Sequence, residues 1–126
     1  MQTPEASRLD GRTFLVTGAT SGVGLATTRG LVARGAVVYG ASRAGKKGDA
    51  THGVALDLTE PSSIARVRAD LSSSHAHLDG LVNAAGGFYW EPSATKLGVD
   101  RAWAVNYFGH VLLTRALWPM LVAAPH

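Results

Sequence analysis

Short apolar runs alternate with segments of helical periodicity along this chain. The runs are rich in β-branched residues and predict buried strands at residues 13–17, 37–41, 53–56 and 78–83. Apolar residues three and four positions apart predict helices at residues 23–33, 61–73 and about 95–122. Pro61 suits a first helical turn, whereas Pro119 is expected to kink or end the last helix.

Strands that alternate with helices predict a mainly parallel sheet. The continuous apolar character of the strands agrees, because parallel strands are buried on both faces. Right-handed crossovers give the expected strand order 3-2-1-4. The fold class is therefore α/β, a three-layer αβα arrangement that amounts to about half of a doubly wound domain plus one strand.

Length and composition limit the function classes. The chain has 126 residues, which suits one domain. It has no cysteine, so disulfides, thiolate nucleophiles and cysteine-ligated zinc are excluded, and no metal site is expected. Its formal net charge is +3 with scattered basic residues, which argues against a nucleic-acid footprint. Without a signal sequence or an apolar run of about 18 residues, we expect a cytoplasmic protein that does not enter a membrane.

The segment Thr17-Gly18-Ala19-Thr20-Ser21-Gly22-Val23-Gly24 lies between the first strand and the first helix. Glycines remove side chains where a backbone must approach a phosphate, and the free amides at a helix start stabilise the anion. The hydroxyls of Thr20 and Ser21 can donate further hydrogen bonds. This context predicts a pyrophosphate-binding loop and hence a Rossmann-like dinucleotide-binding domain over residues 12–126, preceded by a polar lead-in at residues 1–11.

The T-G-x-x-x-G-x-G spacing of this loop resembles that of the short-chain dehydrogenase/reductase family. Asp57-Leu58 ends the third strand where that family places an adenine contact, and Asn83-Ala84-Ala85-Gly86 resembles its N-A-G segment. The resemblance covers residues 11–126 and implies hydride transfer between a nicotinamide and a carbonyl or hydroxyl carbon of a small molecule. It also implies that Asn106 is the family's structural and proton-relay asparagine. The expected cofactor contacts are Gly18, Thr20, Ser21, Gly22, Val23, Gly24, Ser42, Arg43, Asp57, Leu58, Asn83, Ala84, Ala85 and Gly86.

The end of the second strand indicates which nicotinamide cofactor is bound. Counting about 20 residues past the glycines reaches Ser42-Arg43, where no acidic residue is available for a ribose 2′-hydroxyl. A guanidinium can instead bind a 2′-phosphate in bidentate fashion. Arg43 therefore favours NADP(H) over NAD(H), although an ordinary solvated arginine at a strand end would look the same.

The rest of the family's active site is not found in this sequence. The resemblance implies a serine and a Y-x-x-x-K pair, but the residues four positions after the three tyrosines are Arg43, Ser93 and Val111. We therefore expect the chain alone to be inactive and to need a complementing C-terminal segment. A split enzyme, a truncated one, a self-associating short protein and a non-catalytic NADP(H)-binding or assembly subunit all remain open.

An incomplete sheet has a structural consequence. The fourth strand is expected at a sheet edge, and an unpaired apolar edge invites pairing with another chain. Trp103, Phe108, Leu112 and Trp118 are expected to be exposed on the last helix, which would mark an interface. We therefore expect a homo-oligomer or a complementing half as partner. The run Phe88-Tyr89-Trp90 either lines a substrate pocket or covers the core or an interface.

Overall fold

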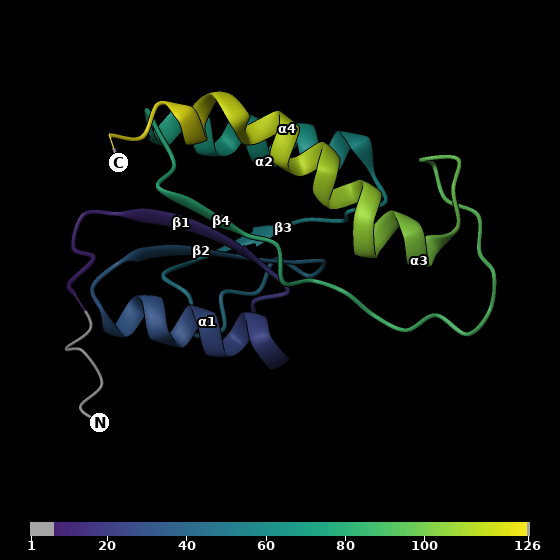
Figure 1. Ribbon diagram of the computed structural model, residues 1–126, viewed down its shortest axis with the longest axis horizontal. Coiled ribbons are helices and arrows are strands. Elements are labelled where there is room, and N and C mark those ends of the chain that lie inside the picture. The colour runs from purple at the N-terminus through teal and green to yellow at the C-terminus, as the bar shows by residue number, and fades with distance from the viewer. Residues whose placement is uncertain (1–6, 126) are drawn as a thin grey trace.

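The computed structural model describes residues 7–125. Its strands are β1 (Thr13–Thr17), β2 (Val37–Ser42), β3 (His52–Ala55) and β4 (Gly80–Val82). Its helical elements are α1 (Gly22–Ala33), α2 (Pro61–Ser74), α3 (Arg101–Trp103), the π-helical segment η1 (Ala104–Phe108) and α4 (Gly109–Val122). Helix α1 covers one face of the sheet while α2 and α4 cover the other (Figure 1), which confirms the three-layer αβα architecture.

The four strands are parallel and lie in the order β3-β2-β1-β4, as predicted. Val16 in β1 lies opposite Gly40 in β2 and Val82 in β4. The chain runs from β1 outward to β2 and β3, then returns to place β4 on the other side of β1. Open α/β sheets bind ligands at the carboxyl ends of strands where the order reverses in this way. This topology places a candidate site beyond the ends of β1 and β4.

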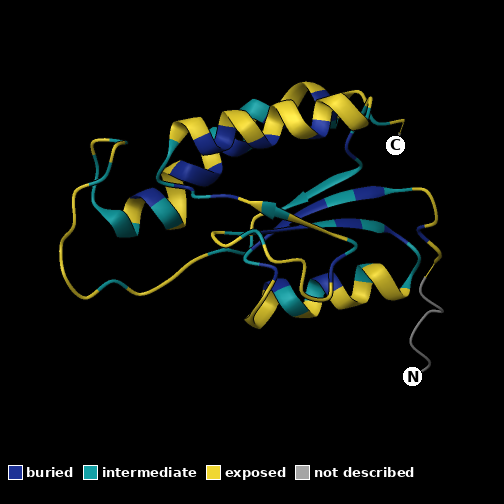
Figure 2. Cartoon of the chain, turned by 180° about the vertical axis from the view of Figure 1, so that it is seen from behind, coloured by how far each residue is buried: buried dark blue, intermediate teal, exposed yellow. Residues whose placement is uncertain are grey.

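Two hydrophobic clusters hold the layers together. The larger cluster lies between the sheet and the α2–α4 pair and contains the fully buried Leu15, Leu78, Leu113 and Leu117. The smaller cluster lies on the α1 face and includes Val16 and Val38. Figure 2 shows buried residues on the strands and the inward helix faces, with exposed residues along the outer faces. The alternation of Leu15 and Val16 between the two clusters explains why β1 is apolar throughout.

Two predicted boundaries were wrong. Strand β4 begins at Gly80 rather than residue 78, because the Leu78 amide donates to the Met120 carbonyl of α4 (3.0 Å) and not to a neighbouring strand. The last helical region begins at Arg101 rather than near residue 95. Gly98 has a left-handed φ of +76°, and the Asp100 carboxylate accepts a hydrogen bond from the Ala102 amide (3.1 Å) as the helix cap.

Pro119 does not end α4, which continues to Val122. Beyond the proline, the amides of Ala123 and Ala124 still donate to the carbonyls of Pro119 and Leu121, each at 3.3 Å. The helix therefore tolerates the proline for one further turn. Within the described residues, no helix combines the length and apolar composition that crossing a membrane requires.

Candidate functional site

The loop between β1 and α1 depends on glycine for its backbone conformation. Gly18 and Gly22 have φ values of +62° and +54°, in the left-handed region that strains L side chains. A Cβ on Gly18 would also lie 2.7 Å from the Cα of Ala85, and a Cβ on Gly24 would collide with the Gly18 carbonyl. The spacing of these glycines therefore lets the start of α1 and the segment after β4 approach the same loop.

The start of α1 is open to an anion. Ser21 is the N-cap of this 12-residue helix, but its side chain makes no capping hydrogen bond. The first amides of a helix have no intrahelical partner, and the helix dipole favours negative charge beside them. The β1–α1 loop can therefore hold a phosphate at the position the sequence predicts.

Thr17 joins the β1–α1 loop to the segment after β4. The hydroxyl oxygen of Thr17, almost fully buried, accepts hydrogen bonds from the amides of Ala84 and Ala85, each at 3.0 Å. These bonds fix residues 84–86 directly beside Gly18. No motif in the sequence marks this function of Thr17, although a threonine at the end of a buried apolar strand is a signal that such a polar group needs partners.

A cleft of about 200 Å³ lies beyond the carboxyl ends of the strands. We call it the cofactor cleft. Eight of the predicted contact residues line it, namely Gly18, Thr20, Ser42, Arg43, Asp57, Leu58, Ala85 and Gly86. The other predicted contacts do not line it: Ser21, Gly22, Val23 and Gly24 belong to the adjoining loop and helix start, and Asn83 and Ala84 precede the wall formed by Ala85 and Gly86.

The cleft has unmet hydrogen-bonding capacity. Within the described residues, the buried Ser42 Oγ and the buried Arg101 Nε have no hydrogen-bond partner, and both residues line the cleft. Buried polar atoms normally have a hydrogen-bond partner, so these two atoms are free to bind a ligand. A hydroxyl and two guanidinium groups, with Arg43 beside Ser42, suit an anionic ligand. The residues present therefore fit a phosphorylated dinucleotide.

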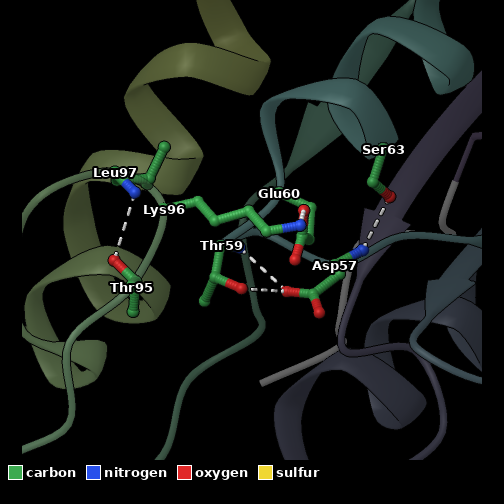
Figure 3. Close-up of polar contacts among 7 residues, drawn as sticks. All are labelled: Asp57, Thr59, Glu60, Ser63, Thr95, Lys96 and Leu97. Atoms are coloured by element: carbon green, nitrogen blue, oxygen red, sulfur yellow. Dashed lines mark hydrogen bonds and ion pairs between the residues drawn. The ribbon is translucent and has the colours of Figure 1, made fainter.

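Asp57 is held in its ionised form at the floor of the cleft. Its carboxylate accepts hydrogen bonds from the Thr59 hydroxyl (2.7 Å) and the Thr59 amide (2.9 Å), and its own amide donates to Ser63 Oγ (Figure 3). Burial alone would raise the pKa of Asp57, but the Thr59 bonds and the charges of Arg43 and Arg101 outweigh burial and lower it. Asp57 therefore presents a fixed acceptor between two cations.

Residues of the long loop between β4 and α3 close the cleft. Tyr89 lines it, and the Arg101 guanidinium lies 5.2 Å from the centre of the Tyr89 ring. The neighbouring Phe88 and Trp90 are each 93% exposed. The predicted aromatic run thus divides, with Tyr89 at the cofactor cleft and its two neighbours on the surface. Lys96 ties the same loop to α2 through an ion pair with Glu60 (2.9 Å), visible in Figure 3.

Asn106 lies outside the cofactor cleft, in η1. Its Oδ1 accepts from the Gly87 amide and its Nδ2 donates to the Gly87 carbonyl, both at 2.9 Å. These bonds anchor the loop that follows the cleft wall. Single π-helical turns inside α-helices occur frequently at functional sites, and η1 carries the one residue that the resemblance assigns to proton relay.

A second cavity lies along η1 and α4, beside the segment that follows β4. This groove has a volume of about 660 Å³ and a mainly apolar lining. We call it the α4 groove; it is lined by Asn83, Ala85, Asn106, Tyr107, His110, Val111, Thr114, Arg115, Trp118 and Pro119. Trp103, Phe108 and Trp118 are 61%, 39% and 58% exposed, while Leu112 is partly buried.

Arg101 and His110 were not predicted as site residues. Arg101 lies at the start of a short helix, and its place in the cofactor cleft depends on the loop before it, which has no sequence periodicity. His110 lies on the apolar helix α4. It is buried and lies 2.9 Å from Thr17 Oγ1, a contact across 93 residues that local patterns cannot indicate.

The chain is similar to known proteins over nearly its whole length. A family model described as short chain dehydrogenase matches residues 12–126. Polyprenol dehydrogenase from Mus musculus is 35% identical over 127 residues, covering 90% of this chain and 38% of the relative. Sorbitol dehydrogenase from Cereibacter sphaeroides is 34% identical over 126 residues, covering 92% and 49%. The chain thus spans less than half the length of these relatives.

Solved structures agree with the sequence relatives. A metagenomic short-chain oxidoreductase in complex with NADP superposes with a TM-score of 0.73 at 31% identity, covering 91% of this chain and 58% of that one. A short-chain dehydrogenase from Streptomyces avermitilis gives a TM-score of 0.69 at 32% identity, covering 92% and 45%. The chain belongs to the short-chain dehydrogenase/reductase family, whose members are oxidoreductases that bind nicotinamide cofactors.

Proposed function

We propose that this chain is the NADP(H)-binding part of a short-chain oxidoreductase that transfers hydride between the nicotinamide and a carbonyl or hydroxyl carbon of a small molecule. The observation that carries the proposal is the cofactor cleft, where the glycine loop, the orphaned Ser42 hydroxyl and two guanidinium groups converge. When bound, the cofactor supplies the hydride donor or acceptor. The chain's own residues bind and orient it.

Each wall of the cleft has a distinct function in this proposal. The amides at the start of α1 and the backbone of Gly18 hold the pyrophosphate, and Asp57 accepts a hydrogen bond from the adenine amino group. Ala85 and Gly86 form the wall beside Gly18 of the glycine loop. Their position is fixed by Thr17, so the cleft is held open before a ligand enters.

The preference for NADP(H) rests on Ser42 and Arg43. Arg43 is exposed at the end of β2 and, within the described residues, forms no salt bridge. The Arg43 guanidinium is therefore available for a 2′-phosphate. The Ser42 hydroxyl can donate to the same group.

Calorimetry of NADPH and NADH binding tests this assignment. Arg43→Glu is expected to weaken NADPH by about 100-fold, since one charge-assisted pair of roughly 2 kcal/mol is lost and repulsion replaces it. NADH should change by less than about threefold. Arg68→Glu is the matched control, because Arg68 is an exposed arginine on α2 that lines a different cavity. Equal losses for both nucleotides would refute the 2′-phosphate assignment, and no heat with either would refute nucleotide binding altogether.

Catalysis in this proposal needs a complementing segment that supplies the catalytic serine and the Y-x-x-x-K pair, which is not found in these 126 residues. Two features support the place where it docks. Within the described part of the chain, β4 pairs only with β1, so its other edge has free hydrogen-bonding groups. The adjoining α4 groove carries the exposed rings of Tyr107 and Trp118. Such a segment belongs either to the same polypeptide or to a separate chain.

The same exposed surface favours the alternative, a non-catalytic NADP(H)-binding or assembly subunit that uses the groove for a stable partner. The two proposals differ in whether a complementing polypeptide brings about turnover. NADPH oxidation across a panel of carbonyl compounds should be absent for the isolated chain under both. Activity that appears on adding a polypeptide with a Y-x-x-x-K segment supports the enzyme, and robust turnover by the isolated chain contradicts the need for complementation.

A further inference from the structure

His110 is a buried titratable group with no function in the site described above. It is 7% exposed in α4 and its Nε2 lies 2.9 Å from the hydroxyl oxygen of Thr17. That oxygen is the one that holds the amides of Ala84 and Ala85. His110 therefore contacts the cofactor cleft through one intermediary, from the side of the α4 groove.

The hydrogen bonds of Thr17 determine the tautomer of His110. A hydroxyl has two lone pairs and one proton. Both lone pairs are engaged by the Ala84 and Ala85 amides, so the proton must be donated. The candidate acceptors are His110 Nε2 at 2.9 Å and the Val82 carbonyl at 3.4 Å, and the shorter contact has the better hydrogen-bond distance. This assignment makes Nε2 the unprotonated acceptor and places the proton of a neutral imidazole on Nδ1.

Protonation of His110 disturbs this network. An imidazolium donates from both nitrogens, so Nε2–H would direct a third donor at an oxygen that has only two lone pairs. One of the three donors must then give up its bond, and two of them are the amides that fix the wall beside Gly18. Gly18 lies very close to this wall, since a Cβ on Gly18 would lie 2.7 Å from the Cα of Ala85. A small shift of the wall therefore changes the shape of the cofactor cleft.

We infer that His110 is a positioning residue for cofactor binding: its neutral imidazole accepts the Thr17 hydroxyl proton and so keeps Ala84 and Ala85 in place, and its protonation weakens nucleotide affinity. The inference rests on the proposed NADP(H) site. Burial lowers the pKa of His110, which keeps the imidazole neutral near pH 7.

The surroundings of His110 leave it free to act in this way. From η1 and α4, the titratable side chains that line the same groove are Tyr107 and Arg115. From β1 and the segment after β4, the neighbours are the neutral Thr17, Asn83 and Ala85. Among the described residues, no carboxylate lies within salt-bridge distance of His110. In the part of the chain that the structure describes, no ion pair therefore stabilises the imidazolium.

The first test is the tautomer of His110, read from ¹H–¹⁵N correlation spectra of histidine-labelled protein at pH 7.5. The expected result is an unprotonated Nε2 and a protonated Nδ1. A proton on Nε2 at this pH overturns the inference. This measurement needs no variant and no nucleotide, so it decides the hydrogen-bond assignment even if the chain binds no NADPH, a result that would overturn the proposed function instead.

The second test is the dissociation constant of NADPH at pH 7.5 and 5.5. His110→Gln supplies an amide oxygen that accepts the same hydroxyl and does not titrate, so its affinity at pH 7.5 should stay within about twofold of wild type. His110→Leu removes the acceptor and should bind about fivefold more weakly, the usual net effect of one hydrogen bond. Between pH 7.5 and 5.5 the wild type should lose more affinity than His110→Gln.

The loss of affinity between the two pH values must be compared between each variant and the wild type, because phosphate monoesters themselves titrate near pH 6. His77→Gln is the control for histidine titration elsewhere, since His77 lies before β4 and pairs with Asp79. It should reproduce the pH profile of the wild type. The inference is overturned if His110→Gln shows the same loss at pH 5.5 as the wild type, or if folded His110→Leu binds NADPH as tightly as the wild type does.

Discussion

Replacing Thr17 by valine removes one hydroxyl group from the junction of β1, β4 and α4 and leaves the shape of the side chain almost unchanged. The hydroxyl oxygen accepts from two amides at 3.0 Å and contacts His110 Nε2 at 2.9 Å. An unsatisfied buried donor or acceptor costs about 1–3 kcal/mol. The two amides are only partly buried, so the low end applies to each, and the loss of the His110 contact adds to it. We expect Thr17→Val to lower the free energy of unfolding by about 2–4 kcal/mol.

Urea unfolding followed by circular dichroism measures this loss, with the m-value expected to stay constant. Thr28→Val is the matched control because Thr28 is equally buried but donates only to the Gly24 carbonyl, one turn earlier in its own helix (2.8 Å). That carbonyl keeps its helical amide partner, so the control should cost less than about 1 kcal/mol. Similar losses for the two variants would refute the reasoning that the Thr17 oxygen supports the cleft wall.

Two further predictions concern the loop and pH. Gly18→Ala combines a left-handed φ with a clash against Ala85 and should abolish detectable NADPH binding in calorimetry. Gly98→Ala is the control: Gly98 also has a positive φ but open space around it, so the variant should lose about 1 kcal/mol of stability and still bind NADPH. NADPH binding by Gly18→Ala would contradict the close approach of Gly18 and Ala85. Because burial lowers the pKa of His110 below its unfolded value of about 6.5, the unfolded chain binds the proton first as pH falls, so the free energy of unfolding should decrease below about pH 6.5 in urea titrations. His110→Gln should flatten that decrease, and an unchanged slope would show that another group is responsible.

The fold could be predicted from local patterns because each strand and helix carries its own periodicity. Parallel order followed from right-handed crossovers, and the glycine spacing located the β1–α1 loop. The last helix was placed too early because Val99 and Trp103 have helical spacing, although Gly98 just before them adopts a left-handed φ and Asp100 provides the cap. A glycine and an aspartate before an apolar run could have signalled that boundary.

The candidate site was less accessible to the same reasoning. Gly18, Ser42 and Asp57 lie at or just after the ends of strands, so their meeting at one edge of a parallel sheet was foreseeable. Arg101 reaches the cofactor cleft only because the loop of residues 83–100 returns it there, and His110 meets Thr17 only through the packing of α4 on β1. Such contacts depend on tertiary structure and leave no periodic signal in the chain.

The η1–α4 helical region connects the cofactor cleft and the α4 groove. From one side, Asn106 and His110 line the α4 groove. From the other, Asn106 holds Gly87 through two hydrogen bonds, and His110 contacts the Thr17 oxygen that holds Ala84 and Ala85. A segment that docks in the groove therefore contacts the same two side chains that support the wall of the cofactor cleft. Because linkage between two binding events is reciprocal, any tightening of nucleotide binding by such a segment must appear equally as tighter docking in the presence of the nucleotide. Asn106 and His110 provide the contacts for that coupling, because both side chains line the groove and also support the residues of the cleft wall.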